Sequence, residues 1–242
     1  MVIVIGIFIL SVISGMLGLG VAFSAIPFLG LFLPDLVHQV QPLSLLLNGI
    51  TALFSTIGFA RSGYVEWKKA IILSVITTSS APVGAYLVQF FAQKQIYVWL
   101  IYLFAVIYLA YRLFKPVKEH PGRENFKLTL ILAVPISILS GFLGVGPGFL
   151  LMPTLILVGF NAKVAAGINA FAVTFPSFSS LIPHLSTAQW NFSLAIPLLV
   201  AGAFGAFIGA RITSIHVPAK KLKAIFGILI VLVTIYKLLK IF

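Results

Sequence analysis

Long apolar runs fill the chain, and short polar stretches separate them. Runs of about 18 apolar residues are long enough to cross a bilayer as helices. Strands of a membrane barrel would be about ten residues long and would alternate in polarity, which these runs do not. The apolar stretches are 1–34, 43–60, 70–93, 95–111, 128–162, 164–210 and 224–236. The pattern predicts an all-α integral membrane protein that crosses the bilayer several times.

Composition narrows this class further. Hydrophobic residues make up 61% of the chain, charged residues 8%, and the mean hydropathy is +1.17. With no Cys, disulfides, thiolate catalysis and Cys-ligated metals are excluded. The net charge of +12 does not indicate a nucleic-acid partner, because the cations lie in short loops between spans. No basic segment precedes the first apolar run, so we expect a multi-pass plasma-membrane protein without a cleaved signal peptide.

The chain repeats itself at an offset of about 125 residues. The segment Ser14–Gly20 reads Ser-Gly-x-x-Gly-x-Gly, and Ser140–Gly146 has the same pattern. Further matches pair Pro27 with Pro153, Asn48 with Asn169, Gly84 with Gly209 and Tyr111 with Tyr236. We therefore predict two tandem four-segment repeats, 1–115 and 128–242, joined by a cytoplasmic linker at 116–127.

The distribution of charge favours inverted repeats. If each repeat made four full crossings, 10 of the 16 basic residues would lie on the linker's side. If the first segment of each repeat enters and leaves on one side, only Lys94, Lys237 and Lys240 remain outside. The second arrangement fits the positive-inside rule better. Length agrees, since 34 residues as one helix would extend roughly 51 Å, against a hydrocarbon core of ~30 Å. Eight plain spans with long tilted first helices are the alternative.

Matched glycines and prolines interrupt the first segment of each repeat and form the first candidate site. Paired interruptions in two halves of a transporter indicate its binding site. Unwound backbone survives at membrane depth only inside protein or beside a water-filled cavity, and the N-terminus of a half-helix suits an anion. Close helix packing by small residues is the alternative. The candidates are Gly18, Gly20 and Pro27, with Gly144, Gly146, Gly148 and Pro153 in the second repeat.

A polar stripe on the next segment is the second candidate. Ser44, Asn48 and Thr51 share one helical face, and Asn169 repeats Asn48. Thr174 and Ser177 supply hydroxyls in the second repeat. Such residues can also act as hydrogen-bonding contacts between helices. An amide that recurs at the symmetric position is costly in lipid, which favours a functional role for the two asparagines.

Several kinds of site are missing from the apolar runs. No Asp or Glu lies deep in a span, and His38 and His184 fall in a loop and at a span end, where we expect interfacial residues. The apolar runs contain neither clustered metal ligands nor the residues that a catalytic site needs. We therefore expect the chain to bind no metal or cofactor and to have no enzymatic activity. A pocket without carboxylates, framed by amide and hydroxyl donors, favours an anionic or neutral solute.

Together these residues resemble the sulfite exporter TauE/SafE family. The resemblance rests on the duplicated Ser-Gly-x-x-Gly-x-Gly…Pro elements, the Asn one helix later and the turn Gly63–Trp67. It implies transport of sulfur-containing anions such as sulfite, sulfoacetate or thiosulfate, often outward. It also implies that the two glycine elements and the two asparagines border the substrate path. Val21 follows Gly20 where the family often continues with glycine, so the second element is closer to the family pattern.

These observations lead us to expect a transporter for a small sulfur oxyanion, sulfite or an organosulfonate. The anion would bind near the bilayer midplane, and the repeats would rock around it to give alternating access. A passive small-anion channel and a membrane protein that only binds partners are the alternatives. A homo-oligomer is compatible with the sequence.

Overall fold

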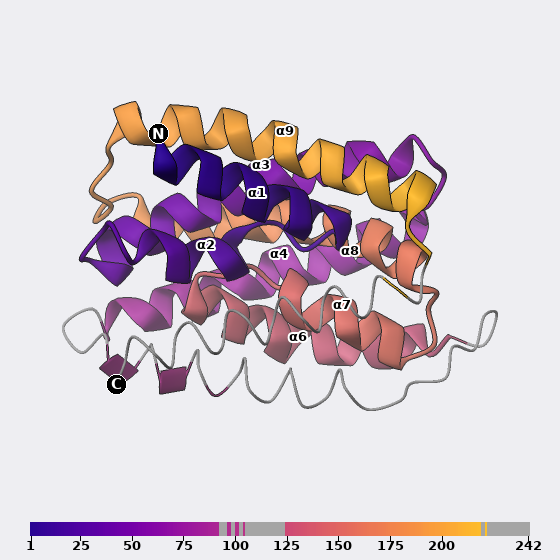
Figure 1. The fold of residues 1–242 in the computed structure, drawn as a ribbon. Helices are drawn as coiled ribbons and strands as arrows, with labels where there is room; N and C mark the ends of the chain where they lie inside the picture. Colours follow the sequence, from indigo (N-terminus) through magenta and orange to yellow (C-terminus); the bar gives the residue numbers. More distant parts are fainter. Residues whose placement is uncertain (92–95, 98–99, 102–103, 105–123, 219–220, 222–242) are drawn as a thin grey trace.

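The computed structural model describes the chain except for residues 92–95, 98–99, 102–103, 105–123, 219–220 and 222–242 (Figure 1). The described part of the chain is helical and contains no strand. Its elements are α1 (Val2–Met16), α2 (Ala22–Leu29), η1 (Leu36–Val40), α3 (Gln41–Ala60), α4 (Trp67–Gln89), α6 (Phe126–Leu143), α7 (Gly148–Leu157), α8 (Ala162–Leu181), η3 (Ile182–His184) and α9 (Phe192–His216).

In the described part of the chain, five helical stretches are long and apolar enough to cross a membrane. They are η1 with α3, α4, α6, α8 with η3, and α9. Large apolar side chains such as Val75, Ile131 and Phe204 are more than half exposed on their outer surfaces. Lipid tails suit such surfaces, so the structure supports the predicted multi-pass helical membrane protein.

Two helical hairpins contain the shorter helices: α1 pairs with α2, and α7 pairs with the membrane-length helix α6. Helix α1 has 15 residues and a length of about 22 Å, which is too short to cross the bilayer. The chain then turns back into α2, and Phe28 packs against Gly6 of α1. In the same way α7 returns along α6, and the Asn125 amide donates to the Val158 carbonyl at 3.0 Å. In Figure 1 the two hairpins open toward opposite ends of the molecule.

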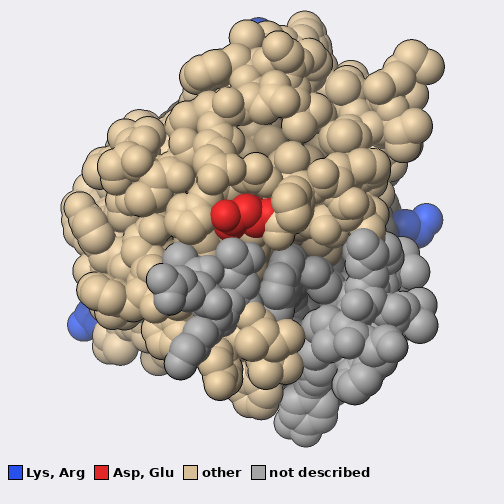
Figure 2. Space-filling model, turned by 90° about the vertical axis from the view of Figure 1, so that its left-hand side faces the viewer, with Lys and Arg blue, Asp and Glu red and all other residues tan. Residues whose placement is uncertain are grey.

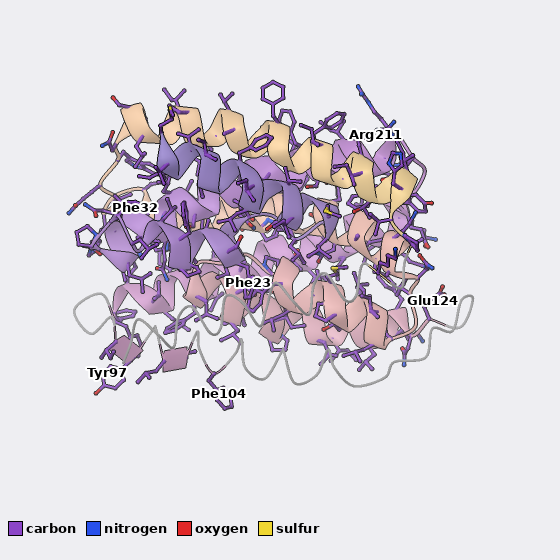
Figure 3. The ribbon with its side chains drawn as sticks, viewed as in Figure 1. Phe23, Phe32, Tyr97, Phe104, Glu124 and Arg211 are labelled. Atoms are coloured by element: carbon purple, nitrogen blue, oxygen red, sulfur yellow. The ribbon has the colours of Figure 1, made fainter. Side chains whose placement is uncertain are left out.

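We call the two ends of the molecule the Asp35 end and the Arg211 end. The Asp35 end contains the loop from Leu31 to Gln39, the end of α4 and the segment from His184 to Asn191. The Arg211 end contains the α3–α4 loop, the start of α6, the α7–α8 loop and the end of α9. Figure 3 shows Phe32 at one end, Arg211 and Glu124 at the other, and Phe23 between them.

Basic residues gather at one end. Among described residues, Arg61, Lys68, Lys69, Lys127, Lys163 and Arg211 lie at the Arg211 end, while the Asp35 end as defined contains no Lys or Arg. Figure 2 looks at the Asp35 end, and it shows acidic atoms near the middle of this face and basic atoms only at its margin.

Two pairs of helices approach each other through matched glycines. Helix α1 packs on α9, and α6 packs on α4. Gly15 lies against the backbone of Ala206, and Gly141 lies against the backbone of Ala81, so that a Cβ at either glycine would overlap its neighbour. The same contact therefore occurs twice, at residues that the sequence comparison had aligned. Small residues permit such close approach in membranes.

The structure differs from the sequence analysis in two details. The glycines alone form the breaks, since Pro27 and Pro153 lie inside α2 and α7, where each removes one helical hydrogen bond. The apolar stretch 164–210 consists of two membrane-length helices, α8 and α9. Most of the predicted fourth segment at 95–111, all of the one at 224–236 and most of the 116–127 linker lie outside the residues that the structure describes, so the repeat boundaries stay a prediction.

Candidate functional site

The two helix breaks have the same backbone conformation. Gly18 and Gly20 have φ of +62° and +70°, and Gly144 and Gly146 have φ of +69° and +68°. In each break the residue between the two glycines donates its amide back to a serine carbonyl, Leu19 to Ser14 and Val145 to Ser140, both at 3.1 Å. This is how left-handed glycines close the C-terminal end of a helix. Side chains rarely adopt such angles, which explains the repeated glycines.

At the first break, α3 occupies the free amides that begin α2. The Val21 amide donates to Thr51 Oγ1 at 3.0 Å. The next amide, of Ala22, donates to Asn48 Oδ1 at 2.8 Å. Thr51 Oγ1 also donates to the Leu47 carbonyl of its own helix at 2.7 Å. Side-chain oxygens thus satisfy two of the orphan amides that a helix start leaves open.

Asn48 connects both breaks. Its Nδ2 donates to Ser177 Oγ on α8 at 2.8 Å. A Cβ at Gly20 would overlap Asn48 Oδ1, and one at Gly146 would overlap Asn48 Nδ2. The Asn48 side chain is fully buried. Both breaks therefore approach one carboxamide so closely that only glycine fits at either position.

The second break is bonded differently. Asn169 Nδ2 donates to the Gly18 carbonyl at 2.7 Å and to the Gly148 carbonyl at 3.2 Å. Asn169 Oδ1 is buried and has no hydrogen-bond partner. Pro147 has no amide hydrogen, and the structure gives the amides of Gly148 and Phe149 no acceptor among the described residues. The start of α7 thus keeps two amide donors without an acceptor, whereas side chains of α3 already bind amides at the start of α2.

The remaining predicted residues take different positions. Ser44 is fully buried on the face of α3 that carries Asn48, and its hydroxyl has no partner. Thr174 Oγ1 donates to the Ala170 carbonyl of its own helix, α8, at 3.0 Å. Pro27 and Pro153 lie within α2 and α7, beyond the breaks. The structure therefore brings together the glycines, both asparagines, Thr51 and Ser177.

Sequence reasoning missed two features. The rings of Phe23 and Phe149 stack at a centroid distance of 5.0 Å beside the two breaks, and these residues are aligned in the duplication. Gln41 lies next to Gly144, two turns before Asn48 on α3. Extending the polar stripe backward by one turn would have found Gln41, and comparing aromatic positions between the repeats would have found the pair of rings.

The side chains that connect the breaks are buried, and none of them is acidic. Asn48, Asn169, Thr51 and Ser177 are fully buried. The described Asp and Glu residues, Asp35, Glu66 and Glu124, lie at the two ends. No group of three potential metal ligands occurs in the described part of the chain. The buried centre thus offers amide and hydroxyl donors without a negative charge.

This fold is that of a multi-pass helical membrane protein with buried helix breaks, which are the places where many transporters bind their substrates. The chain matches the family "Sulfite exporter TauE/SafE" over residues 2–237 and belongs to it. The family is one of membrane transporters, so the chain is a membrane transporter of this family.

Relatives agree with this assignment. The chain is 24% identical to the Bacillus subtilis "Probable membrane transporter protein YunE", with 91% of the chain and 90% of that protein covered. It is 27% identical to a Xylella fastidiosa "Probable membrane transporter protein", with coverage of 92% and 88%. The Arabidopsis thaliana "Sulfite exporter TauE/SafE family protein 1" is 26% identical over 47% of the chain and 26% of that protein. No solved structure matches the chain at a significant level.

Proposed function

We propose that the chain transports a small sulfur-containing oxyanion, sulfite or an organosulfonate such as sulfoacetate. The observation that carries this proposal is the start of α7, where the amides of Gly148 and Phe149 have no acceptor among the described residues. Donor groups at a helix N-terminus, together with the helix dipole, favour an anion. The absence of carboxylates around Asn169 and Asn48 supports the same choice, because a buried negative charge would repel the substrate.

The family description supports a sulfur oxyanion in particular. Tetrahedral and pyramidal oxyanions present several acceptors in a small volume, and these match closely spaced amide and hydroxyl donors. Ser44 Oγ is buried without a partner on α3, between Gln41, which lies against Gly144, and Asn48, which lies against Gly146, so it would be a further donor for such an oxyanion. The phenyl ring of Phe149 lies at the same turn and would exclude water from the bound ion.

The transport mechanism we propose is alternating access between inverted repeats. The hairpin α1–α2 opens to the Asp35 end and α6–α7 to the Arg211 end, and the Gly15 and Gly141 contacts are equivalent. Such relations are expected for two copies with opposite orientation. The basic residues at the Arg211 end favour a cytoplasmic location for that end and for the linker, with the protein in the plasma membrane. Transport would then export the anion from the Arg211 end to the Asp35 end.

A binding screen tests the substrate class. Purified protein is heated with sulfite, sulfate, thiosulfate, sulfoacetate or taurine, and the unfolding temperature is measured. A ligand at about 100 times its Kd stabilises the folded state by ~2.7 kcal/mol. We expect stabilisation by sulfite or sulfoacetate and none by zwitterionic taurine. A chain that no sulfur oxyanion stabilises would overturn the proposed substrate class.

An exchange experiment separates a carrier from a channel. Proteoliposomes are loaded with unlabelled sulfite, and uptake of external radiolabelled sulfite is followed. A carrier that alternates around one site accelerates uptake when substrate is present on the far side, whereas a channel gives flux that neither saturates nor exchanges. Faster uptake into loaded vesicles is the expected result, and equal uptake into loaded and empty vesicles identifies the channel.

A further inference from the structure

A buried histidine lies at the Asp35 end, far from the two breaks. His184 ends η3, and its side chain is fully buried, although its position at the end of a span had predicted an interfacial residue. Its Nδ1 lies 2.9 Å from Nε2 of Gln89 at the end of α4. Its Nε2 makes no hydrogen bond, although the backbone of Val37 in η1 lies nearby. A titratable ring thus occupies the junction of three elements.

The hydrogen bond to Gln89 fixes the neutral form of the ring. A carboxamide nitrogen only donates, so Nδ1 of His184 must be the acceptor and cannot carry a proton. The other atom of this carboxamide, Gln89 Oε1, lies 3.5 Å from Thr187 Oγ1. Protonation at Nδ1 would place its N–H against the N–H of Gln89 Nε2, so that two donors face each other. It would also leave a buried cation without a counter-charge, which costs free energy.

The charged groups around His184 do not compensate for such a cation. Among described residues, η1 contributes His38 and Asp35, and Asp35 Oδ2 already binds His38 Nδ1 at 2.8 Å. The end of α4 contributes Gln89, and the loop after η3 contributes Thr187 and Gln189, which carry no charge. A proton on His184 would therefore lie beside uncharged side chains and a carboxylate that His38 already binds.

The same junction closes the Asp35 end. The Gln189 amide donates to the His38 carbonyl at 2.8 Å, and Gln39 Nε2 donates to Gln189 Oε1 at 2.9 Å. Gln39 and Gln189 also line a cavity of about 100 Å³, together with residues that include Leu33, Leu43 and Trp190. The loop that contains Gln189 follows His184 by only a few residues, so a displacement of His184 would move the loop that closes the cavity.

We propose that His184 is a proton-binding site that keeps the Asp35 end closed when neutral and opens it when protonated. This inference rests on the proposed transport function and names the proton as a ligand coupled to it. His184 binds the proton more tightly in the open state, because there the imidazolium can be hydrated and no longer faces the amide N–H of Gln89. A ligand with such a preference shifts the population toward the open state.

Cysteine accessibility tests this proposal without relying on transport. The chain has no Cys, so a single introduced thiol reports alone. Leu43→Cys places it in the wall of the cavity, and Phe32→Cys, at an exposed position of the same end, serves as the reference for the pH dependence of the thiol itself. A membrane-impermeant maleimide is applied to proteoliposomes at about pH 7.5 and about pH 5.5, the range over which His titrates.

We expect the labelling of Leu43→Cys relative to Phe32→Cys to rise roughly fivefold or more at the lower pH. In the His184→Gln background the ratio should not change with pH. Gln89→Glu provides a second variant, because its carboxylate can accept from protonated His184 and so keeps the end closed at both pH values. A ratio that is independent of pH in the parent chain, or that keeps its pH response in either variant, overturns the proposal.

Uptake measured in the same vesicles separates the two proposals. If labelling responds to pH through His184 but no sulfur oxyanion is transported at either pH, the proposed substrate fails and the proton site stands. If sulfite is exchanged while the labelling of Leu43→Cys does not change with pH, the transport function stands and the proposed proton site is wrong.

Discussion

Asn48 Nδ2 lies 2.8 Å from Ser177 Oγ, and this hydrogen bond joins α3 to α8 through two residues that are 129 positions apart in sequence. Through its other atom, Oδ1, the same carboxamide holds the amide that begins α2. Helices α3 and α8 thus meet between the two breaks, and Asn48 ties the first break to the second half of the chain. Movement of either half must change this contact, which makes it the natural place to measure coupling.

Coupling between Asn48 and Ser177 should be measurable in a double-mutant cycle. Asn48→Ala, Ser177→Ala and the double variant remove the two groups separately and together. We expect an interaction free energy of about 1 kcal/mol, since polar contacts between membrane helices average ~0.6 kcal/mol and reach ~1.7. Unfolding of the purified protein by a denaturing detergent gives the values. Additive effects would show that the contact contributes nothing to stability.

Removing the carboxamide of Asn169 should abolish transport. Asn169→Leu leaves the carbonyls of Gly18 and Gly148 without their donor, so the two breaks lose their direct bridge. Asn48→Leu should have the same effect at the first break. As a matched control, Thr56→Val removes a buried hydroxyl that bonds only to the Ala52 carbonyl of its own helix. Sulfite exchange should vanish in both Leu variants and persist in Thr56→Val; exchange in both Leu variants would refute the site assignment.

Glycine at the breaks should be required for its missing side chain as well as for its backbone angle. Gly20→Ala and Gly146→Ala place a Cβ against Asn48. Gly63→Ala is the control, because Gly63 has a φ of +73° but nothing within 4 Å of its Cβ. We expect a loss of about 1–2 kcal/mol from the left-handed conformation alone at Gly63. Larger losses of stability, with loss of exchange, are expected at Gly20 and Gly146. Equal effects at all three positions would mean that contact with Asn48 is unimportant.

The orientation of the chain can be measured with single cysteines. Phe32→Cys lies at the Asp35 end and Lys68→Cys at the Arg211 end. Because the described basic residues concentrate at the Arg211 end, an impermeant maleimide added to intact cells should label Phe32→Cys. Lys68→Cys should react only after the cells are opened. The reverse pattern would place the Arg211 end outside and reverse the proposed direction of export.

Part of this architecture could be predicted from sequence. The glycine elements at Gly18 and Gly144 predicted the breaks, because left-handed angles and matched positions leave a local signature. The recurrence of Asn48 as Asn169 marked both residues as candidates, and their place in a substrate path stays a prediction. What each carboxamide binds could not be predicted, since it depends on how α3 and α8 cross. Asn48 accepts an amide, whereas Asn169 donates to two carbonyls, although the residues are identical. The burial of His184 depends on packing in the same way.

The position of a bound anion shows directly whether the substrate binds at the start of α7. Selenite is the selenium analogue of sulfite, and its anomalous scattering locates it in a crystal of the protein. We expect one selenium peak at the start of α7, with oxygens about 2.7–3.2 Å from the amides of Gly148 and Phe149. Selenite bound elsewhere, with these two amides still without an acceptor, would contradict it.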